Sequence, residues 1–306
     1  MRNAACTAWC ELYAERPFVF LTGDLGFMAL EPLRDQLGGH FINAGVAEQN
    51  MVSVAAGIRQ TGIETWVYSI APFAYARPFE QIRNDVCINR QPVYIVGNGG
   101  GYGYGVQGPT HHAIEDYGVL LALQGMNVYV PAFADDVGLA IRQLSAAQRP
   151  AYLRLGRCEK PKEFAAPKFT PWRKLLEGGG PILVAVGPIV GPLISAVAQM
   201  DVLTRPELWL LSVMPAGIDA LPAEIVDAAR AGRSLAVVEE HVSQGSAGTA
   251  LVARLAAMGV PPRMFMPFNA KGYPSATYGS QAFHRVESGI DAESVLRALS
   301  TTDSRQ

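Results

Sequence analysis

The sequence predicts an α/β protein with two doubly wound domains, the first built on a parallel sheet and the second smaller and mostly parallel. Three observations support this prediction. The chain has 306 residues, which is too long for one ordinary core and suits two domains of typical size. Short apolar, β-rich runs alternate with helical stretches. A stretch rich in Pro, Lys and Gly interrupts this alternation between residues 160 and 180.

The first part of the chain contains the apolar runs of a parallel sheet. These runs fall at residues 18–21, 41–43, 65–69, 93–96, 128–130 and 151–155, and an alanine-rich helix is expected at residues 47–60. Continuous apolar strands separated by helices are typical of a parallel sheet that is covered on both faces. Binding residues are then expected at the carboxyl ends of the strands.

The interruption separates two predicted domains. Residues 1–165 form the first domain, residues 166–179 form a linker, and residues 180–306 form the second domain. The second domain has its own apolar runs at residues 182–187, 208–213 and 234–238, and a helix is expected near residues 251–258.

Composition and charge exclude several classes of function. Hydrophobic residues make up 49% of the chain and charged residues 17%, so the chain can bury substantial cores. The net charge of -2 gives no basic excess for nucleic-acid binding. No apolar run approaches the roughly 20 residues that a membrane span needs. The first residues lack the apolar stretch of a signal peptide, so we expect a cytoplasmic protein.

The cysteines predict no special chemistry. Cys6, Cys10, Cys87 and Cys158 form neither a CxxC pair nor a cluster with histidines. A disulfide framework and a zinc site are therefore not expected, and no metal site is predicted in this chain.

A carboxylate follows the second predicted strand. Asn43 suits the N-cap of the next helix, and Glu48 lies in the first turns of that helix. Val52 and Ala55 share a helix face with Glu48. The pattern alone leaves two interpretations at about even weight: a carboxylate set among small apolar residues, or an exposed glutamate favoured by the helix dipole.

A glycine-rich segment follows the fourth predicted strand and ends in His111 and His112. So many glycines imply a backbone that bends sharply or approaches something closely. The segment lacks the Lys-Ser/Thr of a phosphate loop and does not open into a helix as a dinucleotide loop does. Two adjacent histidines suit proton transfer, although such pairs are more often structural. The pattern from Arg77 to Asp85 predicts a solvated helix face.

Together these segments resemble the transketolase family. The segments NAGVAEQNM, FEQIRND, PVYIVGNGGG and GPTHHAIED match the family's pyrimidine-binding domain, in order and at suitable distances. The later segment LAVVEEH resembles the VVEEH signature of the family's C-terminal domain. The resemblance covers nearly the whole chain, and it implies a pyrimidine-binding domain followed by a transketolase C-terminal domain.

The resemblance implies that the protein uses thiamine diphosphate. Glu48 matches a glutamate that hydrogen-bonds a ring nitrogen of the cofactor's aminopyrimidine. Phe73 matches the aromatic residue that stacks on this ring, and Ile70 falls where the family often has a second aromatic residue. Asp24 matches an acidic residue that reaches the cofactor bound across the subunit interface.

The resemblance also implies substrate contacts. His111 matches the histidine that faces the substrate, with a role in hydrogen bonding or proton transfer. Arg157 matches an arginine that binds the sugar-phosphate tail, because a guanidinium fork suits a phosphate dianion. Arg2 is aligned near a second phosphate ligand.

The chain departs from the family pattern around the substrate. Gln107 replaces an aspartate that contacts a substrate hydroxyl, and the family has another histidine near Gly99. A serine expected just after Asp24 is replaced by the segment from Leu25 to Met28. These departures imply that the cofactor chemistry is kept, and they put the usual pentose-phosphate substrate in question.

Full-length members of the family carry another domain before this region. Its Gly-Asp-Gly motif and a later asparagine hold Mg²⁺ against the diphosphate, which suits a hard cation on oxygen ligands. We find no such motif in this sequence. The resemblance therefore implies a split transketolase that moves a two-carbon ketol unit from a ketose, often a ketose phosphate, to an aldose. A separate N-terminal subunit would hold the diphosphate and Mg²⁺ in an α2β2 tetramer.

Other interpretations of the same resemblance lead to different functions. The chain could be the beta subunit of a 2-oxoacid dehydrogenase or a deoxyxylulose-phosphate synthase-like acyl-transferring enzyme, and GPTHH favours transketolase over the dehydrogenase branch. A non-catalytic partner subunit is a third interpretation. The presence of Glu48, Phe73 and His111 argues against it.

Overall fold

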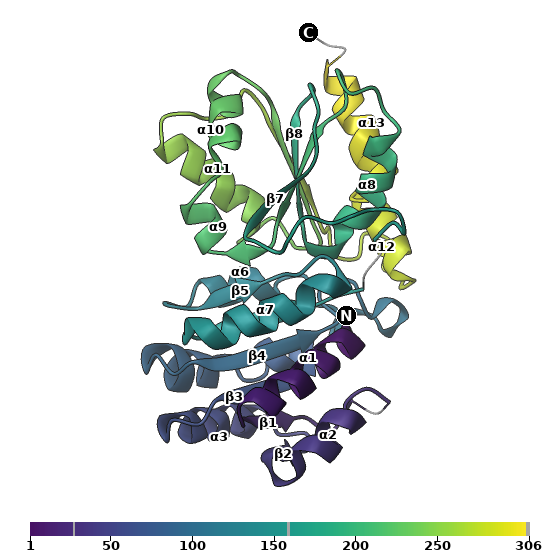
Figure 1. Ribbon diagram of the computed structural model, residues 1–306. Helices are drawn as coiled ribbons and strands as arrows, with labels where there is room; N and C mark the ends of the chain where they lie inside the picture. The colour runs from purple at the N-terminus through teal and green to yellow at the C-terminus, as the bar shows by residue number, and fades with distance from the viewer. Residues whose placement is uncertain (27, 158–159, 304–306) are drawn as a thin grey trace.

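The computed structural model describes residues 1–26, 28–157 and 160–303, and it contains two sheets stacked end to end (Figure 1). Phe27, inside the segment that departs from the family pattern, and Cys158 lie outside the described residues. None of the helices in the described ranges is both long and apolar enough to cross a membrane.

The first sheet has seven strands in the order β10-β5-β6-β4-β3-β1-β2. All neighbouring pairs are parallel except β10 with β5. The strands are β1 (Val19–Thr22), β2 (Phe41–Asn43), β3 (Thr65–Ile70), β4 (Val93–Asn98), β5 (Asn127–Tyr129), β6 (Ala151–Leu155) and β10 (Val213–Met214). The six predicted strands of this sheet are therefore confirmed, and the predicted fold class is correct.

Helices cover both faces of the first sheet because alternate strand residues point to opposite sides. Phe20, Trp66 and Tyr94 face one layer, and Val67 and Ile95 face the other. The first layer contains α1 (Arg2–Glu15), α2 (Glu31–Leu37) and α7 (Ala134–Ala147). The second layer contains α3 (Glu48–Gln60), α4 (Ala71–Tyr75), α5 (Phe79–Gln81), the π-helix η2 (Ile82–Ile88) and α6 (Asp116–Leu121).

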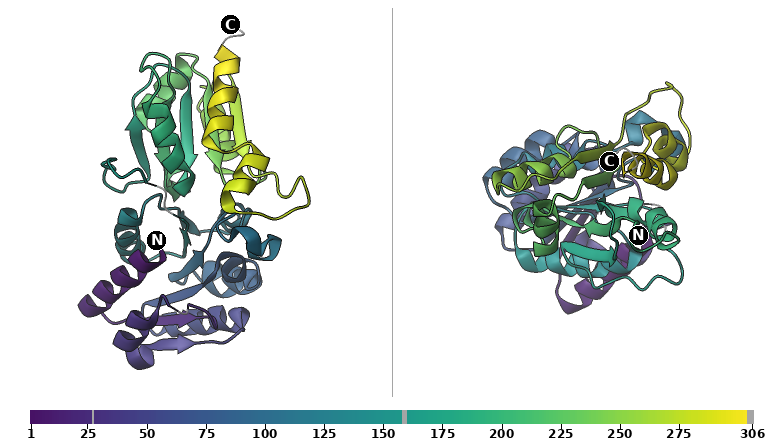
Figure 2. Two further views of the ribbon diagram at one scale, coloured as in Figure 1. Left: turned by 90° about the vertical axis from the view of Figure 1, so that its right-hand side faces the viewer. Right: turned by 90° about the horizontal axis from the view of Figure 1, so that it is seen from above.

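The second sheet has five strands in the order β12-β11-β8-β9-β7, and only β7 is antiparallel to its neighbour. The strands are β7 (Trp172–Leu176), β8 (Ile182–Val186), β9 (Glu207–Leu211), β11 (Leu235–Glu239) and β12 (Phe265–Asn269). Figure 1 shows α8 (Val190–Ala198) and α13 (Ala292–Asp303) on one face. The other face carries α9 (Ala216–Asp219), α10 (Ala223–Arg230) and α11 (Ala247–Ala257). Helix α12 (Gln281–Ser288) lies beside the junction of the two domains (Figure 2).

Two short strands lie where apolar runs do not predict them. Strand β7 falls inside the stretch 166–179 that the sequence predicts as a linker. Only alternate residues of this edge strand are buried, so it carries no continuous apolar run. Strand β10 follows β9 in the chain but pairs with β5 of the first sheet, so the chain crosses between the domains at this point.

A buried ion pair joins the two domains. The Arg173 guanidinium on β7 donates to both carboxylate oxygens of Asp136 on α7, each at 2.7 Å. The side chains are only 1% and 4% exposed. Asp136 also accepts hydrogen bonds from the backbone N–H groups of Ala132 and Phe133 at 3.1 and 3.0 Å. These partners compensate the cost of burying the two charges.

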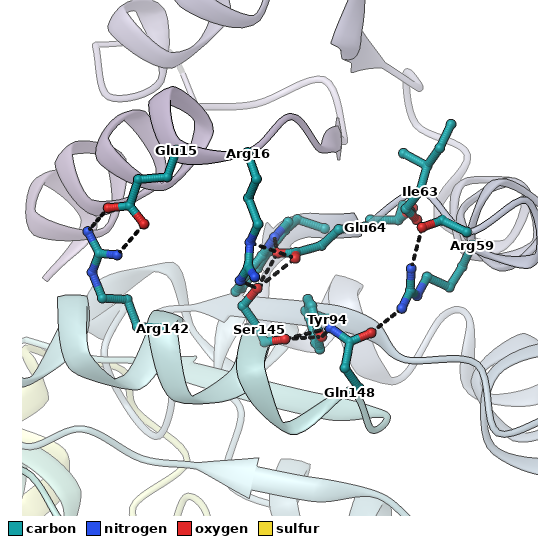
Figure 3. Close-up of polar contacts among 12 residues, drawn as sticks. Glu15, Arg16, Arg59, Ile63, Glu64, Tyr94, Arg142, Ser145 and Gln148 are labelled. Atoms are coloured by element: carbon teal, nitrogen blue, oxygen red, sulfur yellow. Dashed lines mark hydrogen bonds and ion pairs between the residues drawn. The ribbon is translucent and has the colours of Figure 1, made fainter.

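The amino edge of the first sheet contains another buried carboxylate. Glu64 accepts hydrogen bonds from the Ser145 hydroxyl at 2.6 Å and from the Trp66 indole N–H at 2.9 Å. The Arg16 guanidinium lies 3.4 Å from it (Figure 3). Because every partner comes from the fold itself, Glu64 ties β3 to α7 and to the end of α1.

We predict that Asp136→Asn lowers the free energy of unfolding by about 3–5 kcal/mol, because Arg173 is left as a buried charge without its partner. Urea denaturation followed by tryptophan fluorescence measures this loss. Asp227→Asn is the matched control, since Asp227 pairs with Arg230 on the exposed surface of α10. The control should change stability by less than about 1 kcal/mol. Equal effects of the two variants would contradict the proposed role of the buried pair.

Candidate functional site

The carboxyl ends of the parallel strands meet at one edge of the first sheet. The strand register places Thr22 of β1 beside Asn43 of β2, and Ile70 of β3 beside Asn98 of β4. Leu155 of β6 lies beside Asn98 on its other side. The chain leaves these strands toward Asp24, Phe73, the glycine-rich segment and Arg157, so one edge collects the predicted site residues.

Glu48 is the first residue of α3 and is only 5% exposed. Val52 and Ala55 on the same helix face are fully buried. The interpretation of a carboxylate among small apolar residues is therefore confirmed, and that of an ordinary exposed glutamate is wrong. The N-terminal position on the helix favours a negative charge. In the described part of the chain, the one polar partner of the Glu48 carboxylate is Arg77, whose Nη1 donates to Oε1 at 2.8 Å.

Asn43 does not cap this helix, contrary to prediction. The N-cap residue is Ala47, which makes no side-chain cap. The Asn43 side chain instead accepts the backbone N–H of Gly45 at 2.8 Å and donates to Asp24 Oδ1 at 3.0 Å. The intervening turn separates Asn43 from the helix, so its amide orients the exposed Asp24 carboxylate at the sheet edge.

Phe73, Arg77 and His111 form a continuous group of contacts beside Glu48. Phe73 is half-buried in α4, and the Arg77 guanidinium lies over its ring at 3.8 Å from the ring centroid. The His111 ring contacts Phe73 edge-on, with 5.3 Å between centroids. The ring of Tyr104 lies 5.8 Å from that of His111. The structure therefore brings together Glu48, Phe73 and His111.

The two adjacent histidines have different environments. His112 Nε2 donates to the Gly105 carbonyl at 2.7 Å, and its Nδ1 lies 2.9 Å from the Tyr273 hydroxyl of the second domain. Burial lowers the pKa of His112, so its ring is neutral and structural. His111 is half-buried, and its Nδ1 lies 2.9 Å from the Thr110 hydroxyl. The structural interpretation of the pair therefore holds for His112, and His111 is the histidine at the sheet edge.

The glycine-rich segment approaches other parts of the same chain, as the prediction of a close approach requires. Gly99 and Gly101 have positive φ angles of 80° and 65°. A side chain at Gly99 would overlap the Tyr104 ring. A side chain at Gly101 would overlap the Glu240 carboxylate of the second domain. There is thus no room for a histidine at Gly99 while Tyr104 occupies its present position.

The predicted substrate residues lie on exposed backbone at the same edge. Arg157 and Arg2 are exposed, and the Gly156 N–H lies 3.4 Å from Met1 Sδ, so their chain neighbours are in contact. Burial raises the pKa of Tyr104, and the positive charge of Arg2 partly opposes this shift. Arg2 therefore acts on the site electrostatically.

Three further positions complete the predicted set. Ile70 ends β3 and is half-buried. Gln107 ends a single 3₁₀ turn and is exposed. Met28 is 75% exposed at the edge of the described chain.

Arg77 is the functional candidate that sequence reasoning missed. The pattern predicts a solvated helix face from Arg77 to Asp85, which is correct for the exposed Arg83 and wrong for Arg77. Its spacing of one helical turn from Phe73 is the available signal, because residues four apart on a helix are neighbours. The Ser53 hydroxyl donates to Asp85 at 2.6 Å and joins α3 to the π-helix beside the site. Within the described ranges, no group of three or more His, Cys, Asp or Glu side chains is arranged to hold a metal ion.

Comparisons with known proteins agree on the family. The model of the transketolase pyrimidine-binding domain matches residues 1–162. One of the two chains of an apulose-4-phosphate transketolase, from Phocaeicola vulgatus, is 27% identical over 293 residues, which are 92% of this chain and 90% of that protein. A 1-deoxy-D-xylulose-5-phosphate synthase of Clostridium perfringens is 24% identical over 88% of this chain and 44% of its own length.

A solved structure agrees with both domains. The structure described as a split gene transketolase, an inactive beta4 tetramer, superposes with a TM-score of 0.82 at 26% identity. The match covers 98% of this chain and 96% of that one. The domain match, the sheet order and the edge that collects Glu48, Phe73 and His111 lead to one conclusion: the chain belongs to the transketolase family.

Proposed function

We propose that this chain is the C-terminal subunit of a split, thiamine-diphosphate-dependent transketolase. It transfers a two-carbon ketol unit from a ketose or ketose phosphate to an aldose. The observation that carries this proposal is the buried Glu48 carboxylate beside the half-buried Phe73 ring at the carboxyl edge of the sheet. The names of the similar proteins, a subunit of an apulose-4-phosphate transketolase and a split gene transketolase, support it.

The residues at this edge fit the aminopyrimidine half of thiamine diphosphate. The ring needs a proton-holding carboxyl group and an aromatic face, and Glu48 and Phe73 supply both within reach of one guanidinium. Bound thiamine diphosphate supplies the nucleophilic carbon of the reaction. Glu48 holds a proton at the ring nitrogen, Phe73 stacks on the ring, and Ile70 adds an apolar contact. Asp24 reaches toward the cofactor across the subunit interface.

His111 acts on the substrate. Its Nδ1 is next to the Thr110 hydroxyl, which leaves Nε2 to hydrogen-bond a substrate oxygen or to move a proton to it. Phe73 contacts the His111 ring, so the substrate histidine and the cofactor-stacking residue support each other.

Arg157 and Arg2 bind the phosphate of a phosphorylated sugar. Both side chains are exposed, and the residues next to them are in contact, so their guanidinium groups can converge on one anion. Gln107, Met28 and Gly99 depart from the family pattern at the substrate end of the site. These departures select a sugar other than the usual pentose phosphate.

The active enzyme includes a second subunit. We propose that an N-terminal transketolase subunit holds Mg²⁺ and the diphosphate, and that two copies of each chain form a cytoplasmic α2β2 tetramer. The beta4 tetramer among the similar structures is described as inactive, which supports the need for another chain. The domain arrangement follows the predicted boundaries, with residues 1–165 as the pyrimidine-binding domain and 180–306 as the C-terminal domain.

One other activity has support from a specific relative. The similarity to a 1-deoxy-D-xylulose-5-phosphate synthase favours acyl transfer from a 2-oxoacid as the alternative reaction. The donor decides between the two. A transketolase consumes a ketose and releases no carbon dioxide, whereas the synthase-type reaction decarboxylates its donor.

We predict that Glu48→Gln lowers kcat of the assembled enzyme by at least about 100-fold, because the amide cannot exchange a proton with the ring nitrogen. Steady-state rates with a ketose donor and an aldose acceptor measure this loss. Glu80→Gln is the matched control, since Glu80 is an exposed glutamate on α5. Full activity of Glu48→Gln would remove the proposed cofactor role.

We predict that Arg157→Met raises KM for a phosphorylated donor roughly tenfold, the value of one charge-assisted hydrogen bond. KM for the same sugar without its phosphate should stay unchanged. Arg149→Met, at the opposite edge of the sheet just before β6, is the control. An equal rise in KM for both donors would show that Arg157 does not bind the phosphate.

A further inference from the structure

Both contacts that the aminopyrimidine needs from this chain are already occupied by one side chain. Arg77 Nη1 donates to Glu48 Oε1 at 2.8 Å. The same guanidinium lies 3.8 Å from the centroid of the Phe73 ring. Arg77 thus takes the carboxylate and an aromatic face at the same time.

We propose that Arg77 fills the pyrimidine pocket of the cofactor-free chain and leaves it when the cofactor binds. This inference rests on the proposed function. A guanidinium is planar, delocalised and edged with N–H donors, and it stacks well on aromatic rings. An aminopyrimidine that shares a proton with a carboxyl group presents the same features. The two groups cannot occupy one place, so they compete for Glu48 and Phe73.

Burial of Glu48 explains why the pocket needs a substitute occupant. A buried carboxylate without a partner is strongly destabilising. Glu64, which is also buried, has partners in Ser145, Trp66 and Arg16. Glu48 has Arg77 as its one polar partner within the described ranges. Arg77 therefore stabilises the free chain, and the arriving ring takes over the same role.

The position of Arg77 allows it to leave. Its side chain is 43% exposed and follows the short helix α4, so a change of rotamer takes the guanidinium into water. Arg154 is a contrast. It pairs with Asp116 at 2.8 Å, its side chain is only 4% exposed, and it also bonds backbone carbonyls of Ala113 and Glu240. An arginine fixed in this way has no route out, whereas Arg77 has one.

Competition by Arg77 weakens cofactor binding by the fraction of molecules in which the pocket is open. Arg77→Met removes the competitor and keeps an apolar stem of similar length. The assembled enzyme with its partner subunit is titrated with thiamine diphosphate and Mg²⁺ by calorimetry, and association is followed by stopped-flow fluorescence. We expect the dissociation constant of Arg77→Met to fall by about five- to tenfold, with faster association.

Two further variants sharpen the test. Arg77→Lys keeps the charge without the planar fork, so its affinity should lie between those of the wild type and Arg77→Met. Arg83→Met is the control, because the exposed Arg83 bonds only to Asn84 at 2.8 Å, and its affinity should equal that of the wild type. Without cofactor, Arg77→Met should melt at a lower temperature than the wild type, and thiamine diphosphate should raise its Tm by a larger amount.

Each outcome decides a separate point. Unchanged or weaker binding by Arg77→Met would overturn the competition, because Arg77 would then be neutral or a ligand in the bound state. An equal gain in Arg83→Met would overturn it as well, since general loss of charge would be the cause. If the wild-type complex binds no thiamine diphosphate, the proposed function fails, and so does the competition that depends on it.

Discussion

The arrangement of the site depends on the register of the parallel strands in the first sheet. Pairing of Thr22 with Asn43 and of Ile70 with Asn98 ends four strands at one edge. The loops that leave this edge carry a carboxylate, an aromatic ring and a histidine from distant parts of the sequence. A shift of one strand by one residue would turn its side chains to the opposite face, so the buried faces of the sheet also hold the site in register.

A second constraint is that every buried carboxylate needs a partner. Asp116 and Asp136 pair with arginines inside the fold, and Glu240 binds Arg285 and Gln281 at the domain junction. These pairs join the two domains and serve stability. Glu48 differs because its arginine is partly exposed and lies on an aromatic ring. Comparison of buried carboxylates by the mobility of their partners thus separates a site for a ligand from structural pairs.

Sequence patterns predict the features that local residues decide. Apolar runs place the six parallel strands of the first sheet, and the helix that begins at Glu48 ends at the predicted Gln60. Contacts between distant segments escape this reasoning. Strand β10 has two residues and pairs with a strand far away in the sequence, and the Glu48–Arg77 pair needs the turn after β3. The difference between His111 and His112 also arises from tertiary structure, because Tyr273 of the second domain takes one of the two rings.

The central claim is that this chain supplies half of a cofactor site and needs a partner for the other half. The most direct measurement is calorimetric titration of thiamine diphosphate with Mg²⁺ into the isolated chain and into its complex with the subunit that co-purifies from the native host. The account predicts heat of binding from the complex and none from the isolated chain at the same concentrations. Equally tight binding by the isolated chain would contradict it.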